Sequence, residues 1–347
     1  MLKKKLSIKD LARELNISAT SVSFILNGKA KEKRISEELV KKVEQYAAKT
    51  GYKPNSLARS LRTGKSNIIG LMVENISNPF FANIARFIEE KAYKSGYKII
   101  YCSTDNDPDK TRDLIQMYRE RHVDGYIITP PEGIEEDVTA LTAAGSPVVL
   151  FDRHLPGLDE DFVVINNEES TYNATRHLID HGYRQIAFVT LNSLQSQMQD
   201  RLSGYERALK EAKLPRNIKE LSYTADSAVL TRHITAFLKR HPELDALLFS
   251  TNYLGVSGIK AINAVGRRIP DDLAVISFDD HDVFELNTPS ITAIAQPIEE
   301  IAEKLITTLL GKLNRTNKGK PKDIVLPAKL LVRNSTGVKA GTLKTDK

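Results

Sequence analysis

The chain has 347 residues, 41% of them hydrophobic and 27% charged, a composition typical of a globular protein long enough for more than one domain. Its single cysteine, Cys102, excludes an intramolecular disulfide, and its N-terminal residues lack the apolar core of a secretory signal. No apolar run approaches membrane-spanning length. These features predict a soluble, cytoplasmic protein without a membrane partner.

The net charge of +6 is unevenly distributed along the chain. Residues 1–65 contain 16 Lys and Arg against 6 Asp and Glu, a net charge of +10, whereas the remaining residues contain 34 against 38, a net charge of −4. A basic head on a slightly acidic body favours nucleic acid as the partner of the head. A basic segment that only improves solubility is the alternative interpretation.

The first 51 residues predict three short helices. Ser7 and Asp10 form a variant of the capping box before the first helix, Ser18 caps the second, and Ser36 caps a third that Gly51 closes. Two short helices joined by a tight turn and braced by a third follow the helix-turn-helix plan, in which the second helix enters the major groove of DNA. A small helical cap without DNA contacts is the alternative.

The outward side chains of the second helix are the candidate DNA-reading groups. Thr20 can hydrogen-bond a base edge or a phosphate, and Ala19 or Phe24 can contact a thymine methyl group. Hydroxyl and amide side chains nearby suit phosphate contacts. The candidates in this head are Ser7, Ser18, Ala19, Thr20, Ser21, Ser23, Phe24 and Asn27.

A short basic segment, NSLARSLRTGKS, occupies residues 55–66 before the first apolar strand. Leu57 and Leu61 stand four residues apart and would share one face of a short helix, with Arg59 and Arg62 beside them. From composition alone the segment could be a basic linker or a misplaced core helix, and two turns of helix are marginal in water. We therefore predict a helix-turn-helix domain at 1–54 and a separate linker segment at 55–65, whose role as a hinge is implied by the family resemblance described below.

Apolar strands alternate with helical stretches from residue 66 to residue 336. This alternation predicts an α/β body of two doubly wound parallel-sheet lobes behind the all-α head. We place the N-lobe at about 66–162 and 291–322, and the C-lobe at about 163–290 and 323–336. Residues 337–347 are expected to form a disordered tail.

Polar and aromatic side chains recur directly after the predicted strands. Ligands of such sheets bind outside the carboxyl ends of the strands, and carboxylates, amides, an arginine and aromatic rings suit a sugar or another small polar molecule. Each side chain taken singly could instead cap a helix or satisfy a loop. The candidate effector-binding residues are Asn75, Phe80, Phe81, Asp152, Arg201, Asn252, Tyr253 and Asp279.

Two short motifs could suggest a metal site. His177 and His181 have a spacing that can bind zinc, but they suit the negative end of a helix and no third ligand follows. The acidic run at 279–282 lacks the spacing and central glycine of a calcium loop. No phosphate-loop, zincin or serine-hydrolase motif occurs, so we predict no metal, no cofactor and no catalytic residue.

Taken together, these segments resemble the LacI (lactose-repressor) family of bacterial transcription regulators. The resemblance covers about residues 5–336 and is carried by SIKDLARELNISATSVSFILNGK, NSLARSLRTGKSNIIGLMV, VDGYIITPP, HLIDHGYRQIAFV, RLSGYERALKEAKL and IPDDLAVISFDD, which occur in family order. It implies a body with the fold of periplasmic sugar-binding proteins. It also implies a regulator, usually a repressor, that binds operator DNA as a homodimer under the control of a small effector.

The resemblance assigns further roles to residues of this chain. It implies that residues 55–62 are a hinge helix that folds on DNA, with Leu61 wedged into a base step of the minor groove. Arg201 and Asp279 would contact the effector, and Phe81 would form a wall of its site. The DNA contacts that it implies in the hinge are Asn55, Leu57, Ala58, Arg59 and Leu61.

This chain departs from the family pattern at a few of these positions. Phe24 stands where the family often has Arg or His, so guanine recognition there does not carry over. The pair Asn252 and Tyr253 replaces the usual Asn-Asp, and Asn166 and Asn167 stand where Asp is frequent. The operator sequence and the identity of the effector therefore remain open.

Two other classes of protein share parts of this pattern. A sugar-binding receptor for transport or chemotaxis would have the two lobes, but the basic head and the absence of a signal peptide argue against it. An enzyme with a doubly wound fold and a helical appendage is the other alternative, for which the sequence offers no nucleophile and base. We predict a non-enzymatic, ligand-controlled transcriptional regulator that associates with the nucleoid when bound to its operator.

Overall fold

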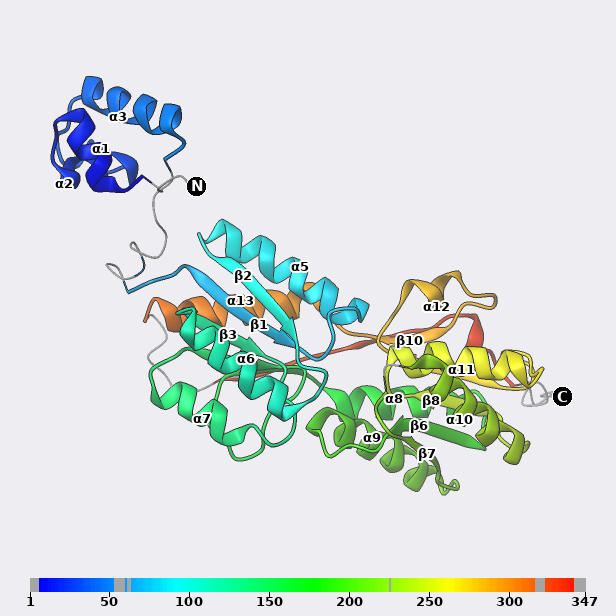
Figure 1. Ribbon diagram of the computed structural model, residues 1–347. Helices are drawn as coiled ribbons and strands as arrows, with labels where there is room; N and C mark the ends of the chain where they lie inside the picture. The colour runs from blue at the N-terminus through cyan, green and yellow to red at the C-terminus, as the bar shows by residue number, and fades with distance from the viewer. Residues whose placement is uncertain (1–5, 53–59, 61–63, 225, 316–321, 340–347) are drawn as a thin grey trace. The chain divides into compact units, whose positions relative to one another are not determined.

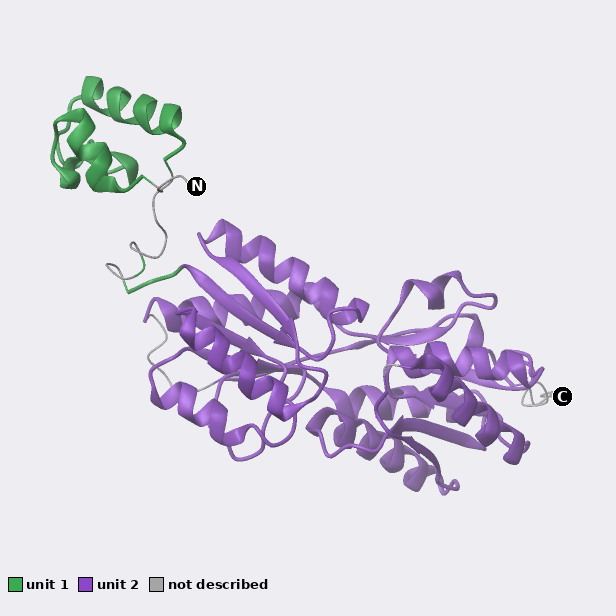
Figure 2. Ribbon diagram, in the orientation of Figure 1, with its two compact units in different colours: residues 1–66 green, residues 67–347 purple. Residues whose placement is uncertain are grey.

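The computed structural model describes residues 6–52, 60, 64–224, 226–315 and 322–339. The chain divides into two compact units, residues 1–66 and 67–347 (Figure 2). Within the described ranges, no helix is both long enough and apolar enough to cross a membrane.

The first unit is a bundle of three helices, α1 (Ile8–Leu15), α2 (Ala19–Leu26) and α3 (Glu37–Thr50) (Figure 1). The predicted caps are confirmed. Ser7 and Asp10 form a complete capping box, the hydroxyl groups of Ser18 and Ser36 accept backbone N–H bonds at the next two helices, and Gly51 ends α3 in the left-handed region. The helices enclose a small core made of Leu11, Ala12, Leu15, Val22, Ile25, Val43 and Ala47.

The first lobe of the second unit is a sheet of six parallel strands in the order β11-β5-β4-β3-β1-β2. Apolar side chains of α5 and α13 pack on one face of this sheet, and those of α6 and α7 pack on the other. The elements are β1 (Ile68–Val73), α5 (Pro79–Lys94), β2 (Lys98–Ser103), α6 (Pro108–Glu120), β3 (Gly125–Ile128), α7 (Glu135–Ala143), β4 (Val148–Phe151), β5 (Phe162–Ile165), α13 (Ile298–Leu313) and β11 (Asp323–Leu326).

The second lobe is a six-stranded sheet in the order β12-β10-β9-β8-β6-β7, parallel except for β12, which is antiparallel to β10. Its elements are α8 (Asn167–Asp180), β6 (Ile186–Leu191), α9 (Ser196–Ala212), β7 (Asn217–Leu221), α10 (Ser227–Arg240), β8 (Ala246–Phe249), α11 (Asn252–Ala264), β9 (Ala274–Phe278), α12 (Asp282–Leu286), β10 (Thr292–Ala295), β12 (Lys329–Leu331) and the short 3-10 helix η1 (Asn334–Thr336). The fold class expected from the sequence is therefore confirmed.

The strand pairing differs from the lobe boundaries predicted from the sequence. β5 and β11 complete the first sheet, although residues 163–165 and 323–326 were expected in the C-lobe, and β10 belongs to the second sheet although residues 291–322 were expected in the N-lobe. The chain therefore crosses between the lobes after β5, after β10 and after β11. An apolar run indicates a buried strand, but the choice of sheet depends on pairing with residues far away in the sequence.

A close approach of α8 and α9 depends on Gly204. A Cβ atom at this position would lie 2.1 Å from the carbonyl oxygen of Glu168 and 2.9 Å from the backbone nitrogen of Tyr172. Both are backbone atoms, so the clash can be relieved only by moving the two helices apart.

Gly204→Ala is accordingly expected to lower the free energy of unfolding by about 3 kcal/mol, the upper part of the range for overpacked interiors. Urea unfolding followed by circular dichroism measures the change. Gly337→Ala is the matched control, because Gly337 has an ordinary negative φ and open space around it. Equal stability of the two variants would contradict tight packing at Gly204.

The C-terminal segment is docked on the second lobe through residue 339. The Tyr183 hydroxyl donates to the carbonyl oxygen of Gly337 at 2.9 Å, the Lys339 N–H donates to the carbonyl oxygen of His181 at 2.9 Å, and Lys339 Nζ lies 2.7 Å from Asp245 Oδ2. The predicted start of a disordered tail at residue 337 is thus wrong, because these partners hold residues 337–339. Residues 340–347 lie outside the described residues.

His177 lies under this docked segment, and its pKa differs from that of a free histidine. Its Nε2 is 2.9 Å from Thr336 Oγ1, while His181 Nδ1 is 2.7 Å from the carbonyl oxygen of His177. Burial, reinforced by neighbouring His181 and opposed by Asp180, lowers the pKa of His177. No group of three or more His, Cys, Asp or Glu side chains among the described residues is arranged to hold a metal ion.

Because the pKa of His177 is lower in the folded chain than in the unfolded chain, its neutral form favours folding. That contribution is fully present above the unfolded pKa of about 6.5 and is lost as the pH falls through the folded value. His177→Gln is expected to make stability less sensitive to pH below 6.5, measured by thermal unfolding in a pH series. His233→Gln, at an exposed histidine of α10, should leave the pH profile unchanged; parallel profiles for the wild type and both variants would contradict the assignment.

Candidate nucleic-acid interface and effector cleft

The α2 helix presents most of the candidate DNA-reading side chains. Thr20 is exposed at its first turn, and within the described residues its hydroxyl makes no hydrogen bond. Phe24 is half-buried, and Lys33 Nζ lies 5.3 Å from the centroid of its ring. An exposed hydroxyl and a partly exposed ring with an ammonium group beside it are suited to a base edge and the adjacent phosphate.

The other candidates of the head take part in its local hydrogen bonds. The hydroxyl groups of Ser18 and Ser21 are 2.9 Å apart, and Asn27 Nδ2 donates to the carbonyl oxygen of Ser23 at 2.6 Å. Ser7 caps α1, and Ala19 is half-buried at the start of α2. Ser7, Ser18 and Asn27 are exposed and Ser21 and Ser23 are half-buried, so these side chains remain accessible to solvent. The hinge candidates Asn55, Leu57, Ala58, Arg59 and Leu61 lie outside the described residues.

The first lobe contributes a buried charge network at the carboxyl ends of β1 and β4. Arg153 Nη2 lies 2.8 Å from Glu74 Oε2 and 2.9 Å from Asp152 Oδ2, and its Nη1 donates to Asn106 Oδ1 at 2.9 Å. Asn106 Nδ2 in turn donates to Glu74 Oε2 at 2.7 Å. The side chains of Arg153, Glu74 and Asp152 are at least 92% buried, so each charge depends on the others.

The second lobe contributes Arg201, a fully buried side chain of α9. Its Nε donates to Asn167 Oδ1 at 2.8 Å, its Nη1 donates to the carbonyl oxygen of Ser250 at 2.7 Å, and its guanidinium lies 3.6 Å from the ring centroid of Phe278. Burial lowers the pKa of Arg201 and raises that of Asp279, while the attraction between the two charges opposes both shifts. This pair is a strong, desolvated donor and acceptor for polar groups of a ligand.

The two lobes contact one another directly around this region. Asn252 Nδ2 at the start of α11 donates to Asn78 Oδ1 before α5 at 2.9 Å, and Gln195 Nε2 donates to Asn106 Oδ1 at 3.3 Å. The Leu194 N–H donates to Glu132 Oε1 at 2.9 Å. The carboxyl ends of the strands of the two sheets therefore face each other. Polar contacts between the lobes hold this closed arrangement, and opening of the lobes would break them.

A cavity of about 290 Å³ lies between the lobes beside these contacts. The rings of Tyr223 and Tyr253 meet edge to face at 6.4 Å in its wall, and the buried Ser257 hydroxyl has no partner among the described residues. Burial raises the pKa of Tyr223 to about 12 and also raises the pKa of Tyr253, so both hydroxyl groups are neutral donors at pH 7. The lining residues are Glu74, Asn75, Ser77, Asn78, Pro79, Tyr223, Thr224, Ser227, Leu230, Asn252, Tyr253, Val256, Ser257 and His281.

The eight predicted effector residues fall into three groups. Asn75, Asn252 and Tyr253 line the cavity, whereas Asp152, Arg201 and Asp279 are linked by electrostatic interactions beside it. Phe80 and Phe81 lie instead in the hydrophobic core of the first lobe, where the Phe81 ring contacts Phe151 edge to face at 6.1 Å.

Sequence reasoning missed several residues of the cleft. Glu74, Asn106 and Tyr223 were not predicted, although Glu74 directly follows β1 and is found by the same rule that identified Asn75. Tyr223 follows β7, a strand whose sequence NIKEL contains only two apolar residues and was not recognised. Its position beside Tyr253 could therefore not be anticipated.

The chain matches known proteins along almost its whole length. Residues 7–55 match the family described as bacterial regulatory proteins, lacI family, and residues 175–336 match a periplasmic binding protein-like domain. The chain is 31% identical to the HTH-type transcriptional regulator DegA of Bacillus subtilis (strain 168) over 96% of this chain and 98% of DegA. It is 30% identical to a ribose operon repressor of Halalkalibacterium halodurans over 95% and 97% of the two chains.

A solved structure gives the same result for the two-lobed body. A periplasmic binding protein/LacI transcriptional regulator from Alkaliphilus metalliredigens QYMF, complexed with D-xylulofuranose, is 27% identical and superposes with a TM-score of 0.69 over 78% of this chain and 99% of that one. The same assignment is supported by the helix-turn-helix head, by the two parallel-sheet lobes and by relatives at about 30% identity. The protein belongs to the lacI family of bacterial regulatory proteins.

Proposed function

We propose that this chain is a homodimeric repressor whose affinity for operator DNA is controlled by a small polar molecule, a sugar or a similar compound, bound between its lobes. Residues 1–54 would read DNA, residues 55–65 would form the hinge, and residues 66–336 would bind the effector and dimerise. The observation that carries the proposal is the cleft. Glu74 of the Arg153 network, Asn252 and Tyr253 line a cavity of about 290 Å³ between the lobes. Arg201 interacts electrostatically with Asp279 and with Tyr253 of the cavity wall.

The chemistry of the cleft supports a polyhydroxylated, uncharged ligand. Carboxylates and amides accept hydrogen bonds from sugar hydroxyl groups, the guanidinium and the neutral tyrosine hydroxyls donate to them, and the tyrosine rings offer an apolar face. A similar regulator was solved with D-xylulofuranose bound. The cavity is also large enough for a purine, which makes purines the first alternative to test.

On DNA, Thr20 with Ala19 and Phe24 would contact base edges in the major groove. Ser7, Ser18, Ser21, Ser23 and Asn27 would hold the phosphates, and the hinge residues Asn55, Leu57, Ala58, Arg59 and Leu61 would enter the minor groove. Two copies of the head would bind the half-sites of a pseudo-palindrome.

Effector and operator would be coupled through the angle between the lobes. Ligand binding favours one hinge angle, and that angle sets the separation of the two hinge segments in the dimer. The coupling is reciprocal, so DNA changes effector affinity by the same factor as effector changes DNA affinity. The proposed chemistry is binding alone, without catalysis or a cofactor, in the cytoplasm and on the nucleoid when the operator is occupied.

A footprint on the DNA upstream of the chain's own gene tests the regulator function. We expect protection of a near-palindromic site at concentrations that leave random duplex free. Binding to that site no tighter than to random duplex would overturn the proposal. A thermal-shift screen of sugars and purines tests the effector site, since a bound ligand raises the melting temperature by mass action.

A further inference from the structure

The loop between α2 and α3, residues 29–34, is a hydrogen-bonded turn. α2 ends as a Schellman motif does, with the Lys29 N–H donating to the carbonyl oxygen of Phe24 at 2.9 Å. The Ile35 N–H then donates to the carbonyl oxygen of Ala30 at 2.9 Å, and the side chains of both residues pack against the core of the head. The two ends of the loop are therefore anchored, and the charged residues lie between them.

This loop contains the whole excess of positive charge in the described head. Residues 6–52 have 9 Lys and Arg against 6 Asp and Glu, whereas the loop has 4 against 1, so the rest of these residues carries no net charge. The four cations of the loop are exposed and form no ion pair within the described residues; they are Lys29, Lys31, Lys33 and Arg34. The attraction of this part of the head for a polyanion therefore originates in the loop.

Lys33 places one of these cations beside α2. Its Nζ lies 5.3 Å from the centroid of the Phe24 ring, a cation–π contact. Phe24 follows Thr20 by one helical turn, so the two side chains share the outward face of α2. An ammonium group at the edge of a helix face that enters the major groove is placed to meet a backbone phosphate.

Arg34 has a backbone conformation that favours glycine. Its φ is 52°, in the left-handed region, and its N–H donates to the carbonyl oxygen of Lys31 at 3.1 Å. Glycine would close the same turn with less strain. Strained positions cluster at functional sites, so an arginine here is expected where its charge is used.

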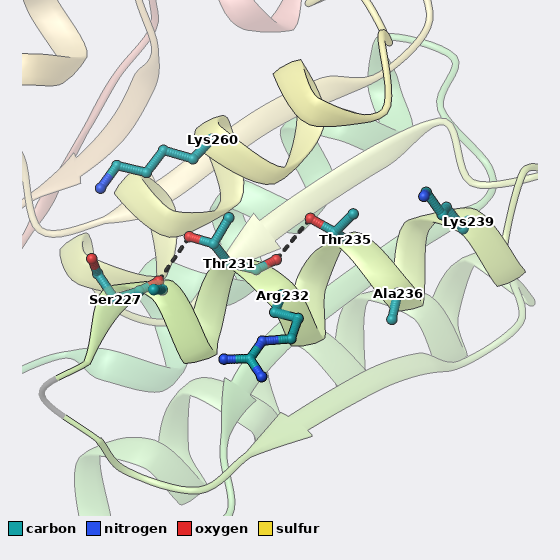
Figure 3. Close-up of a pocket in the computed structure, with 8 residues that line it drawn as sticks. Ser227, Thr231, Arg232, Thr235, Ala236, Lys239 and Lys260 are labelled. Carbon is teal, nitrogen blue, oxygen red and sulfur yellow. Dashed lines mark hydrogen bonds between the residues drawn. The ribbon is translucent and has the colours of Figure 1, made fainter.

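Unpaired cations by themselves do not identify a DNA-binding surface. Arg232, Lys239 and Lys260 also form no ion pair in the part of the chain that the structure describes, and they line a groove of about 610 Å³ between α10 and α11 (Figure 3). These three belong to residues 66–347, whose net charge is −4. The loop differs, because its cations are the excess charge of the described head and Lys33 contacts a candidate DNA-reading side chain.

We infer that residues 29–34 form a phosphate clamp, in which the four cations bind the DNA backbone beside the groove that α2 enters. The inference deepens the proposed function, because it rests on DNA binding by the head and assigns charged backbone contacts to residues outside α2. Phosphate contacts fix orientation and supply salt-dependent affinity without reading sequence. The clamp would thus set how tightly the head binds any duplex, while Thr20 would influence which duplex it prefers.

The salt dependence of DNA binding by the full-length chain tests the inference. Each phosphate neutralised by a cation contributes about 0.9 to the slope of log affinity against log salt concentration. Lys31→Gln with Lys33→Gln is expected to lower this slope by about 1.8 and to weaken binding roughly 60-fold at about 0.1 M salt. The loss should be the same for random duplex and for the footprinted site. Fluorescence anisotropy over a series of salt concentrations measures both slopes.

Lys41→Gln with Lys42→Gln is the matched control. Both lysines are exposed on α3, and their loss changes the net charge of the head by the same amount. A cation that touches no phosphate acts only through screened long-range attraction, so the slope should change by less than about 0.5. Equal changes in the two double variants would show that the loop acts through net charge alone and would overturn the inference.

Arg34→Gly separates DNA binding from folding. Glycine adopts the left-handed region readily, which offsets its greater freedom in the unfolded chain, so the thermal unfolding temperature should stay close to that of the wild type. The slope should fall by about 0.9, as expected for one lost phosphate contact. Circular dichroism measures the unfolding temperature, and a wild-type slope in this variant would exclude Arg34 from the clamp.

Two further results would overturn the inference as a whole. They are wild-type slopes in both loop variants, and a loss of affinity confined to the footprinted site, which would indicate that the loop reads bases. A wild-type chain that protects no specific site would overturn the regulator function instead. The slope on random duplex remains measurable in that case, so the two failures are distinguishable.

Discussion

Arg201→Met is expected to abolish the response to the effector while leaving the DNA-binding head intact. The guanidinium is buried, bonded to Asn167 and to the carbonyl oxygen of Ser250, and electrostatically paired with Asp279. Removing one partner of a buried charge pair costs about 2–5 kcal/mol of binding, which weakens the effector roughly 30- to several-thousand-fold. Isothermal titration with the compound that stabilises the wild type measures the loss.

The control for this variant is Arg207→Met on the same helix. Arg207 is paired with Glu168 and Glu169 at the surface, so its loss should leave effector affinity within about threefold, as expected for an exposed ion pair. Arg201→Met should also unfold at lower temperature, because two buried acceptors lose their donor. If folded Arg201→Met protein binds the effector as tightly as the wild type does, Arg201 does not contribute to effector binding.

Leu61→Ala is expected to weaken specific operator binding about 10- to 100-fold. The prediction rests on the family resemblance, which implies that this leucine wedges into a base step of the minor groove. Burying a leucine side chain contributes about 1.5–3 kcal/mol, and each 1.4 kcal/mol changes affinity about tenfold. Fluorescence anisotropy with the footprinted site and with random duplex measures both affinities at one salt concentration.

We expect Leu61→Ala to lower the affinity for the specific site without lowering the affinity for random duplex. Random duplex is held mainly through phosphate contacts, so its affinity should change little in Leu61→Ala. Leu194→Ala, at a leucine of the body that is 80% exposed, is the matched control and should bind both DNAs as the wild type does. An equal loss for both DNAs, or a matching loss of effector binding, would contradict a role as a wedge.

Local chemistry explains why the head was predictable from the sequence. Each of its helices begins at a serine whose hydroxyl accepts a backbone N–H bond within three residues, and the third ends at a glycine with positive φ. Such signals require only neighbouring residues. The alternation of strands and helices in the body could also be predicted, because it depends on the local periodicity of apolar residues.

Non-local pairing explains what the sequence did not reveal. Residues 323–336 were all expected in the C-lobe, but they include β11 of the first sheet and β12 of the second. Phe80 and Phe81 follow the first strand as ligand-binding residues do, yet they fill the core. In both cases the outcome depends on partners more than 60 residues away, such as Val163 for β11 and Phe151 for Phe81.

The position of β11 has a consequence for the order in which the protein is made. The first sheet is completed by residues 323–326, which leave the ribosome after every other strand of that sheet, whereas the core of the head includes no residue beyond 52. During synthesis, β5 therefore presents an unpaired strand edge until residues 323–326 have emerged. The head can therefore fold well before the first sheet is complete, and in that interval the free edge of β5 is the segment of the body most exposed to pairing with another chain.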